Sequence, residues 1–123
     1  GMLQAMWDRS LDYLVTDLAW GGGITNARRV ALFADSCGLS VLYHDCTGPV
    51  ILAASLQLAL ATRATPMQEI ARAYYYDWYR GVADGVPIIS EGRLESRSTP
   101  GHGVTLRADV LSAEGTTIRR TAV

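Results

Sequence analysis

Three ionisable residues follow one another along the chain at nearly equal distances, and each lies at or near the end of a short apolar segment. Asp17 and His44 are 44 − 17 = 27 residues apart, and His44 and Glu69 are 69 − 44 = 25 residues apart. A strand, its connecting helix and the next parallel strand take about 30 residues together. The spacing therefore predicts successive parallel strands joined by helices, each with an ionisable residue at its carboxyl end.

The segments around these residues have the composition that such an arrangement requires. Residues 11–16 (LDYLVT), 40–43 (SVLY) and 67–70 (MQEI) are short, and their apolar content is typical of strands. Residues 24–34 place alanines and other apolar residues at helical spacing. Residues 50–61 are apolar on nearly every face, so a helix formed by them should be buried on more than one side.

The part of the chain after residue 70 has a different character. Aromatic residues cluster in residues 74–79 (YYYDWY), which we expect to form a helix or an irregular lid. Residues 86–96 predict a hairpin that turns at Glu91-Gly92, and residues 99–103 (TPGHG) predict a loop. The predicted fold class is therefore α/β, a partial (β/α) barrel of about three parallel strand–helix units followed by a small hairpin and an irregular C-terminal segment.

The three ionisable residues should meet at one rim, because the carboxyl ends of parallel strands lie together where an α/β sheet or barrel binds its ligands. Neighbouring strands are about 4.8 Å apart, so we expect Asp17 to accept a hydrogen bond from the His44 ring. A carboxylate in this position fixes the imidazole tautomer and leaves the other ring nitrogen as a general acid or base. Glu69 could be a second acid, or a donor to an oxyanion if burial keeps it protonated.

Each of these residues also has a structural interpretation. A single histidine at a strand end is more often structural than catalytic. Asp17 could simply begin an Asx-type turn into the glycines that follow it. Glu69 could be a surface residue at the end of an edge strand. His102 lies in a Pro/Gly loop, where we expect it to be exposed and inert.

The composition excludes several classes of function. The net charge is −1, so the chain lacks the basic surface that nucleic-acid binding requires. All eleven basic residues are arginines, which excludes a Schiff-base or phosphate-loop lysine from this chain. Cys37 and Cys46 lack the spacing of a zinc or redox motif, which favours free thiols and a cytoplasmic location. The longest apolar stretch, residues 49–61, is too short to span a membrane.

Several stretches of the sequence together resemble a known family. Asp17 is followed by GGITNAR (22–28), the next segment carries HDCTGPV (44–50), Gln68-Glu69 comes after it, and PGHGV (100–104) lies near the end. This set resembles the C-terminal part of the enolase superfamily, in its mandelate racemase/muconate lactonizing enzyme group and especially its acid-sugar dehydratases. The resemblance runs from about residue 3 to residue 110.

The resemblance implies a reaction in which a carbon next to a carboxylate loses its proton and magnesium stabilises the resulting enediolate. His44 and Asp17 match the acid/base dyad of the seventh and sixth barrel strands, and Glu69 matches the eighth-strand residue that hydrogen-bonds the substrate carboxylate. The family's metal carboxylates, its second base and its capping domain lie on parts that this chain does not match, so we expect this chain itself to bind no metal or cofactor. The resemblance assigns residues 2–110 to the C-terminal part of the barrel and residues 111–123 to a C-terminal tail.

Two functions of different classes are open on this basis. In the first, the chain is a truncated C-terminal fragment of a magnesium-dependent acid-sugar dehydratase or racemase, inactive alone and acting on a small carboxylic acid when another chain completes the barrel. In the second, it is a non-catalytic oligomerising module that retains relic site residues. Both predict a homo-oligomer or a completing chain as partner, because a parallel sheet of three strands has two open edges. Neither nucleic acid nor a membrane is expected as a partner.

Overall fold

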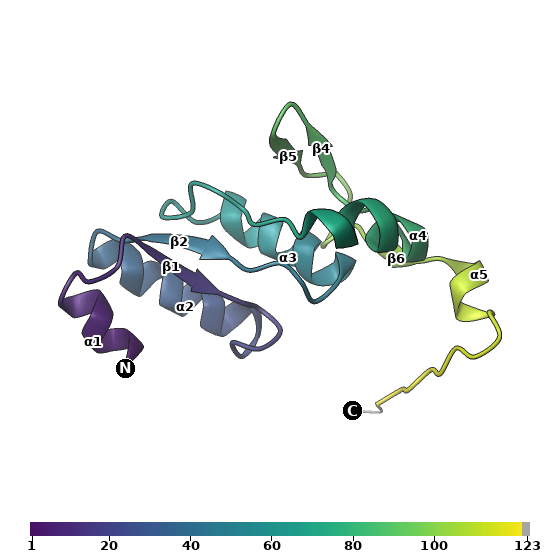
Figure 1. Cartoon of the computed structure of the whole chain (residues 1–123), viewed down its shortest axis with the longest axis horizontal. Coiled ribbons are helices and arrows are strands. Elements are labelled where there is room, and N and C mark those ends of the chain that lie inside the picture. Colours follow the sequence, from purple (N-terminus) through teal and green to yellow (C-terminus); the bar gives the residue numbers. More distant parts are fainter. Residues whose placement is uncertain (122–123) are drawn as a thin grey trace.

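A computed structural model describes residues 1–121 of the chain, which form a mixed α/β arrangement (Figure 1). The two parallel strands and the two longest helices lie in the first half of the chain. In chain order the elements are α1 (Met2–Trp7), β1 (Tyr13–Thr16), α2 (Gly23–Ser36), β2 (Ser40–Tyr43), α3 (Pro49–Leu60), η1 (Tyr74–Tyr79), α4 (Arg80–Val82), β3 (Ala83–Asp84), β4 (Ile88–Ser90), β5 (Arg93–Glu95), β6 (Thr105–Leu106) and α5 (Ala108–Leu111).

Strands β1 and β2 pair in parallel, with Leu14 beside Val41. Helix α2 connects the two strands and packs on the face of the pair where both of these residues are buried (Figure 1). The buried face of α2 consists of small side chains that let the helix approach the strands closely: Ala27, Ala31 and Ala34. The opposite face is open at β1, where Tyr13 is 48% exposed and Val15 is 55% exposed.

Helix α3 is buried on two sides, as its apolar sequence predicts. Leu58 packs into a core that α3 shares with β1, β2 and α2. Leu52 and Ala53 pack into a second core with Tyr75 and Tyr79 of η1. Helix α3 therefore joins the parallel strands to the second half of the molecule.

The third predicted strand is reduced to one parallel bridge between Tyr43 and Gln68. The ladder stops there because the next amide along, that of Ala71, donates to the carboxylate of Asp45 and not to the backbone of β2. Within residues 1–121, β1–α2 and β2–α3 are complete strand–helix units. A third parallel unit, and with it the partial barrel as predicted, is not confirmed by these residues.

The aromatic segment forms η1, a π-helix, and the hairpin that follows it projects from the body (Figure 1). Strands β4 and β5 pair as predicted, and Glu91 and Gly92 have φ angles of 49° and 75°, as a two-residue type I′ turn requires. Tyr75 ties the hairpin to η1. Its buried hydroxyl donates to the carbonyl of Pro87 at 2.8 Å and accepts from the amide of Ile89 at 3.1 Å.

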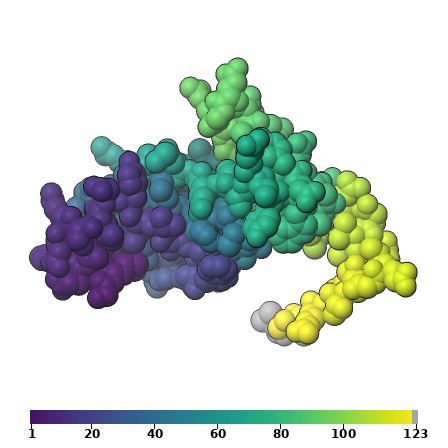
Figure 2. Space-filling view, in the orientation of Figure 1, coloured from purple at the N-terminus to yellow at the C-terminus, as the bar shows by residue number. Residues whose placement is uncertain are grey.

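The end of the chain, drawn in yellow in Figure 2, leaves the body as an arm. Strands β3 and β6 form a short antiparallel pair, and α5 is a short helix that the sequence does not predict. His102 is exposed, as expected. The prediction of an extended tail covers residues 117–123; residues 117–121 form no helix or strand, and 122–123 lie outside the described residues. Among the helices in residues 1–121, none is long and apolar enough to cross a membrane.

Replacing Tyr75 with Phe should lower the free energy of unfolding by about 1–3 kcal/mol, because the buried amide of Ile89 and the carbonyl of Pro87 would lose their partner. Urea denaturation followed by circular dichroism measures the change. Tyr76 is exposed in the same helix, so Tyr76→Phe is the matched control and should change stability by less than about 0.5 kcal/mol. Equal losses in the two variants would contradict the role of the Tyr75 hydroxyl.

Candidate active site

The predicted site residues lie on the face of the parallel strands that is turned away from α2. Side chains alternate along a strand, and Leu14 and Val41 face α2. Positions 17 and 44 continue the other set, which includes the exposed Val15. Because Gln68 lies beside Tyr43, Glu69 belongs to the same set as His44. The structure therefore brings Asp17, His44 and Glu69 to one rim, as the spacing predicts.

The carboxylate of Asp17 is held by four donors. Oδ2 accepts hydrogen bonds from Nδ1 of His44 and from Oγ1 of Thr47, each at 3.0 Å. Oδ1 accepts from the amides of Ala19 at 2.6 Å and Trp20 at 2.9 Å. The predicted contact between Asp17 and His44 is confirmed. The Asx-type turn, which was the structural interpretation of Asp17, is also present, because Oδ1 of the same carboxylate accepts the turn amides. The turn fixes the position of the oxygen that binds the imidazole.

These hydrogen bonds set the charges of the pair. Burial alone would raise the pKa of Asp17, but the hydrogen bonds from His44, from the Trp20 amide and from Thr47 outweigh burial and bring the pKa below its usual value. The hydrogen bond to Asp17 raises the pKa of His44 against the opposing effect of burial, and the carboxylate of Glu69 adds to the increase. The arrangement favours an ionised Asp17 next to an imidazole that accepts a proton readily.

The second ring nitrogen of His44 is available for chemistry. Nδ1 is engaged by Asp17, so the neutral ring donates from Nδ1 and presents Nε2 as an acceptor. The His44 side chain is 28% exposed, which leaves an approach to this nitrogen. The ring of Trp20 lies beside the imidazole, with the centroids 5.5 Å apart and the planes tilted by 40°. Trp20 therefore walls one side of the site.

Glu69 lies next to His44 without binding it directly. Its Oε2 is 4.0 Å from Nε2 of His44 and accepts a hydrogen bond from the amide of Asp45 at 3.1 Å. The side chain of Glu69 is 46% exposed, so the burial that would favour a neutral carboxyl is not present. An atom of a ligand could therefore lie against both Nε2 and Oε2 at the open side of the rim.

Cys46 is close to His44 but is badly placed to act as a nucleophile. Its Sγ is 3.8 Å from Nδ1 of His44, the same nitrogen that Asp17 occupies. In a nucleophile–histidine–carboxylate triad, the nucleophile and the carboxylate use different ring nitrogens. The geometry therefore supports an acid/base role for the Asp17–His44 pair and argues against a covalent thiol mechanism.

Three residues at the site were missed by sequence reasoning: Trp20, Asp45 and Thr47. Asp45 and Thr47 belong to the HDCTGP string, and Trp20 follows the first strand, so each lay near a predicted site residue. Their roles could not be assigned because each depends on a partner that is distant in sequence, such as Asp17 for Thr47.

The residues of this rim do not fit a magnesium site. Both oxygens of Asp17 are already engaged by N–H and O–H donors. Within residues 1–121, no group of at least three His, Cys, Asp or Glu side chains is arranged to hold a metal ion. A metal that serves this rim would need its ligands from elsewhere.

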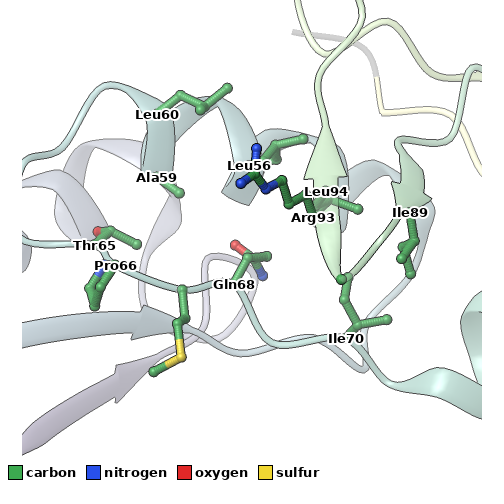
Figure 3. Close-up of a pocket in the computed structure, with 12 residues that line it drawn as sticks. Leu56, Ala59, Leu60, Thr65, Pro66, Gln68, Ile70, Ile89, Arg93 and Leu94 are labelled. Carbon is green, nitrogen blue, oxygen red and sulfur yellow. The ribbon is translucent and has the colours of Figure 1, made fainter.

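A cavity between α3 and the β4–β5 hairpin is lined in part by Met67, Gln68 and Ile70 and does not include the dyad (Figure 3). Its volume is about 530 Å³, and Gln68 points into it toward α3 (Figure 3). The amide nitrogen of Gln68 donates to the carbonyls of Tyr43 and Glu69, at 2.9 Å and 3.1 Å, and its buried Oε1 has no partner in the described residues. The lining is mostly apolar and contains none of the three rim residues, so this cavity is not the candidate active site.

Comparison with known proteins identifies the family to which this chain belongs. A family model described as "Enolase C-terminal domain-like" matches residues 1–110. The chain belongs to the enolase superfamily. The resemblance inferred from the motifs is confirmed, including its extent along the chain.

The curated relatives of this enolase-superfamily chain include acid-sugar dehydratases. It is 29% identical to D-xylonate dehydratase of Haloferax volcanii over 113 residues, which cover 89% of this chain and 27% of the relative. It is also 29% identical to D-gluconate dehydratase of Thermoproteus tenax over 109 residues, which cover 89% of this chain and 22% of the relative. The chain therefore spans about a quarter of the length of these relatives.

Solved structures of the superfamily share the fold. An enolase from the environmental genome sequencing of the Sargasso Sea superposes with a TM-score of 0.81 at 33% identity, over 91% of this chain and 30% of the other. An enolase of the mandelate racemase subgroup from Agrobacterium tumefaciens superposes with a TM-score of 0.77 at 30% identity, over 88% of this chain and 28% of the other. The described elements are thus those of one part of an enolase-superfamily protein.

Replacing Asp17 with Asn should lower the pKa of His44, because the strongest contribution to its increase is removed. NMR titration of the His44 ring measures the change. The pKa of His44 in the folded chain lies above 6.5, so protonation of His44 stabilises the fold fully below pH 6.5. This stabilisation is lost as the pH rises through the folded pKa. The loss of stability with rising pH should be smaller in Asp17→Asn. Asp35→Asn removes the same charge from an exposed position of α2, and an equal shift there would contradict the dyad.

Proposed function

We propose that this chain is the C-terminal part of an acid-sugar dehydratase or racemase, in which His44 and Asp17 form an acid/base group acting next to a substrate carboxylate. The observation that carries the proposal is the 3.0 Å contact between Asp17 and Nδ1 of His44, which leaves Nε2 free at an open rim. The curated relatives named above, which are acid-sugar dehydratases, support the same reaction class.

The dyad can move one proton without consuming another reactant. Nε2 of His44 takes the proton from the carbon next to the carboxylate, or gives a proton to a hydroxyl that leaves the neighbouring carbon as water. Asp17 stays ionised and stabilises the imidazolium that forms between these events. In a dehydration the substrate loses one hydrogen and one hydroxyl in total, and the enol that results becomes a 2-keto acid.

Glu69 is proposed to contact the carboxyl group of the substrate. Its Oε2 lies 4.0 Å from Nε2 of His44, so a carboxyl group bound there would hold the adjacent carbon near the imidazole. A contact between two carboxyl groups requires one shared proton, because two carboxylates at that distance repel each other. The substrate class that follows is a small carboxylic acid.

The rest of the active site is proposed to come from barrel strands outside this chain. A complete barrel takes about 250 residues. Three features of the described part support the proposal: exposed apolar residues on the open face of β1, the single bridge at Gln68, and the span of about a quarter of the relatives' length. In the complete barrel, residues 67–70 would become the third full strand of this chain. Residues 2–110 would form the barrel part and residues 111–123 the tail.

Magnesium is proposed to be held by residues of those other strands. When bound there it would supply the positive charge that stabilises an enediolate. This chain's own contribution would be acid/base groups and substrate contacts, since its rim residues do not fit a metal site. Two free cysteines are compatible with the proposed cytoplasmic location.

The second candidate function is a non-catalytic oligomerising module. The observation that favours it is the open face of β1, where Tyr13 and Val15 are exposed. A second copy of the chain could cover these side chains just as the proposed additional barrel strands could. Activity of the completed barrel separates the two candidates, because a relic site would leave that barrel without turnover.

The isolated chain should give no turnover with sugar acids and magnesium, whereas the protein joined to the remaining barrel strands should convert a dihydroxy acid to a 2-keto acid. In the completed protein, His44→Asn should lower kcat by about 10²–10⁴-fold, because the proton-transfer group is lost. His102→Asn replaces the chain's other, exposed histidine and should leave kcat unchanged. Turnover by the isolated chain that His44→Asn abolishes would refute the need for completion.

The isolated chain should self-associate at micromolar concentration, because association would bury its exposed apolar side chains and pair the unpaired backbone groups of its strand edges. Multi-angle light scattering measures the mass in solution. Val15→Asp should shift the chain toward monomer, whereas Ile118→Asp places the same charge at an exposed apolar residue of the tail and should not. A monomeric parent chain would overturn this proposal.

A further inference from the structure

Asp45 is a buried carboxylate that the proposed reaction does not use. The residue is 1% exposed and directly follows His44. Its Oδ1 accepts a hydrogen bond from the hydroxyl of Tyr79 at 2.9 Å, and its Oδ2 accepts one from the amide of Ala71 at 2.9 Å. Tyr79 is itself fully buried. The carboxylate therefore links the end of β2 to residue 71 and to η1.

The backbone of Asp45 also binds the segment that contains residues 69–71, but as a hydrogen-bond donor and not as an acceptor. Its amide donates to Oε2 of Glu69 at 3.1 Å. Residue 45 therefore donates to the side chain of Glu69 and accepts from the amide of Ala71, two residues further along. The parallel ladder ends at the bridge between Tyr43 and Gln68, so these bonds continue the connection between the segments where the ladder stops.

A carboxylate is a costly group for a purely structural link. A buried ionised carboxyl loses much of its hydration, and the described residues give Asp45 hydrogen bonds but no Arg or His partner within ion-pair distance. Burial accordingly raises the pKa of Asp45, against the hydrogen bonds from Ala71 and Tyr79. What the carboxylate provides in return is a second acceptor, so that one side chain holds a loop amide and a helix hydroxyl at the same time.

We propose that Asp45, held by Tyr79, is a positioning residue that fixes the carboxylate of Glu69 next to Nε2 of His44. Oε2 of Glu69 and Nε2 of His44 are 4.0 Å apart and belong to two different segments. The hydrogen bonds of residue 45 connect these two segments. Tyr79 fixes the Asp45 side chain from the helix behind it, so the half-exposed Glu69 keeps one place above the rim. The inference rests on the proposed function, because this separation acquires chemical meaning when a substrate carboxyl lies between the two groups.

A purely structural role makes a different prediction from a positioning role. If Asp45 and Tyr79 only stabilise the fold, their loss lowers the free energy of unfolding but leaves the effect of Glu69 on His44 unchanged. If they position Glu69, their loss weakens that effect, because the carboxylate can then turn toward solvent. The hydrogen bond that His44 donates to Asp17 is the largest cause of the raised pKa of His44, and the Coulombic interaction with Glu69 adds to it, so the titration of His44 reports where Glu69 lies.

The test is a double-mutant cycle read by NMR titration of the His44 ring in this chain. Glu69→Gln should lower the pKa of His44 in the parent chain and by a similar amount in Tyr75→Phe. In Tyr79→Phe the same substitution should shift the pKa by less than about half as much. Tyr75→Phe is the matched control, because it also removes a buried hydroxyl from η1, one that binds Pro87 and Ile89 and not the rim.

Two substitutions of Asp45 cover the case in which Tyr79→Phe leaves the Asp45 side chain and residues 69–71 in place. Asp45→Ala removes both acceptors and should lose the Glu69 effect, whereas Asp45→Asn keeps one acceptor oxygen and should recover part of it. Urea denaturation confirms that each variant is folded before it is titrated.

An undiminished Glu69 effect in both Tyr79→Phe and Asp45→Ala would overturn the proposal. A loss that also occurs in Tyr75→Phe would overturn it as well, since it would indicate general loosening of η1. The cycle uses no substrate, so absence of turnover in the completed barrel would refute the proposed function without changing this result.

Discussion

The parallel register of β1 and β2 is the constraint on which the site depends. Thr16 lies beside Tyr43, so the residues that follow them, Asp17 and His44, emerge together on the side away from α2. The carboxylate and the imidazole then meet at 3.0 Å. A slip of one residue would turn His44 toward α2 and leave Asp17 with its turn alone. The same pairing thus determines both the packing of the helix and the chemistry of the rim.

The pair and its connecting helix could be predicted from the sequence because they depend on local properties. The apolar content of residues 11–16 and 40–43 and the length of the strand–helix unit are both visible in the sequence. Residues 67–70 have the same local pattern, yet they form one bridge within the described part of the chain. A strand requires neighbours as well as a suitable sequence, and the sequence of residues 67–70 says nothing about which neighbours are present. The spacing therefore located Glu69 correctly but overstated the extent of its strand.

The hydrogen-bond partners of the site were the least predictable part. Asp45 is a polar residue adjacent to His44, and a surface position would have been an equally reasonable expectation. Its burial depends on Tyr79, which is 34 residues away and lies in an aromatic segment whose helical form the sequence left open. For Glu69 the sequence left a buried acid and a surface residue open, and the side chain is 46% exposed. Burial of a polar side chain is set by tertiary neighbours, which explains why sequence reasoning gave its position but not its environment.

The alternation of side chains along β1 and β2 has a consequence for how such a protein can change over time. Leu14 and Val41 face the helix, whereas Asp17 and His44 belong to the other set of positions. A substitution in the second set changes the rim, whereas the first set continues to pack against the helix. Divergence of substrate or reaction can therefore proceed by exchange of rim residues, with little loss of foldability at each step. The two sets therefore serve different purposes although they alternate within the same few residues of the chain.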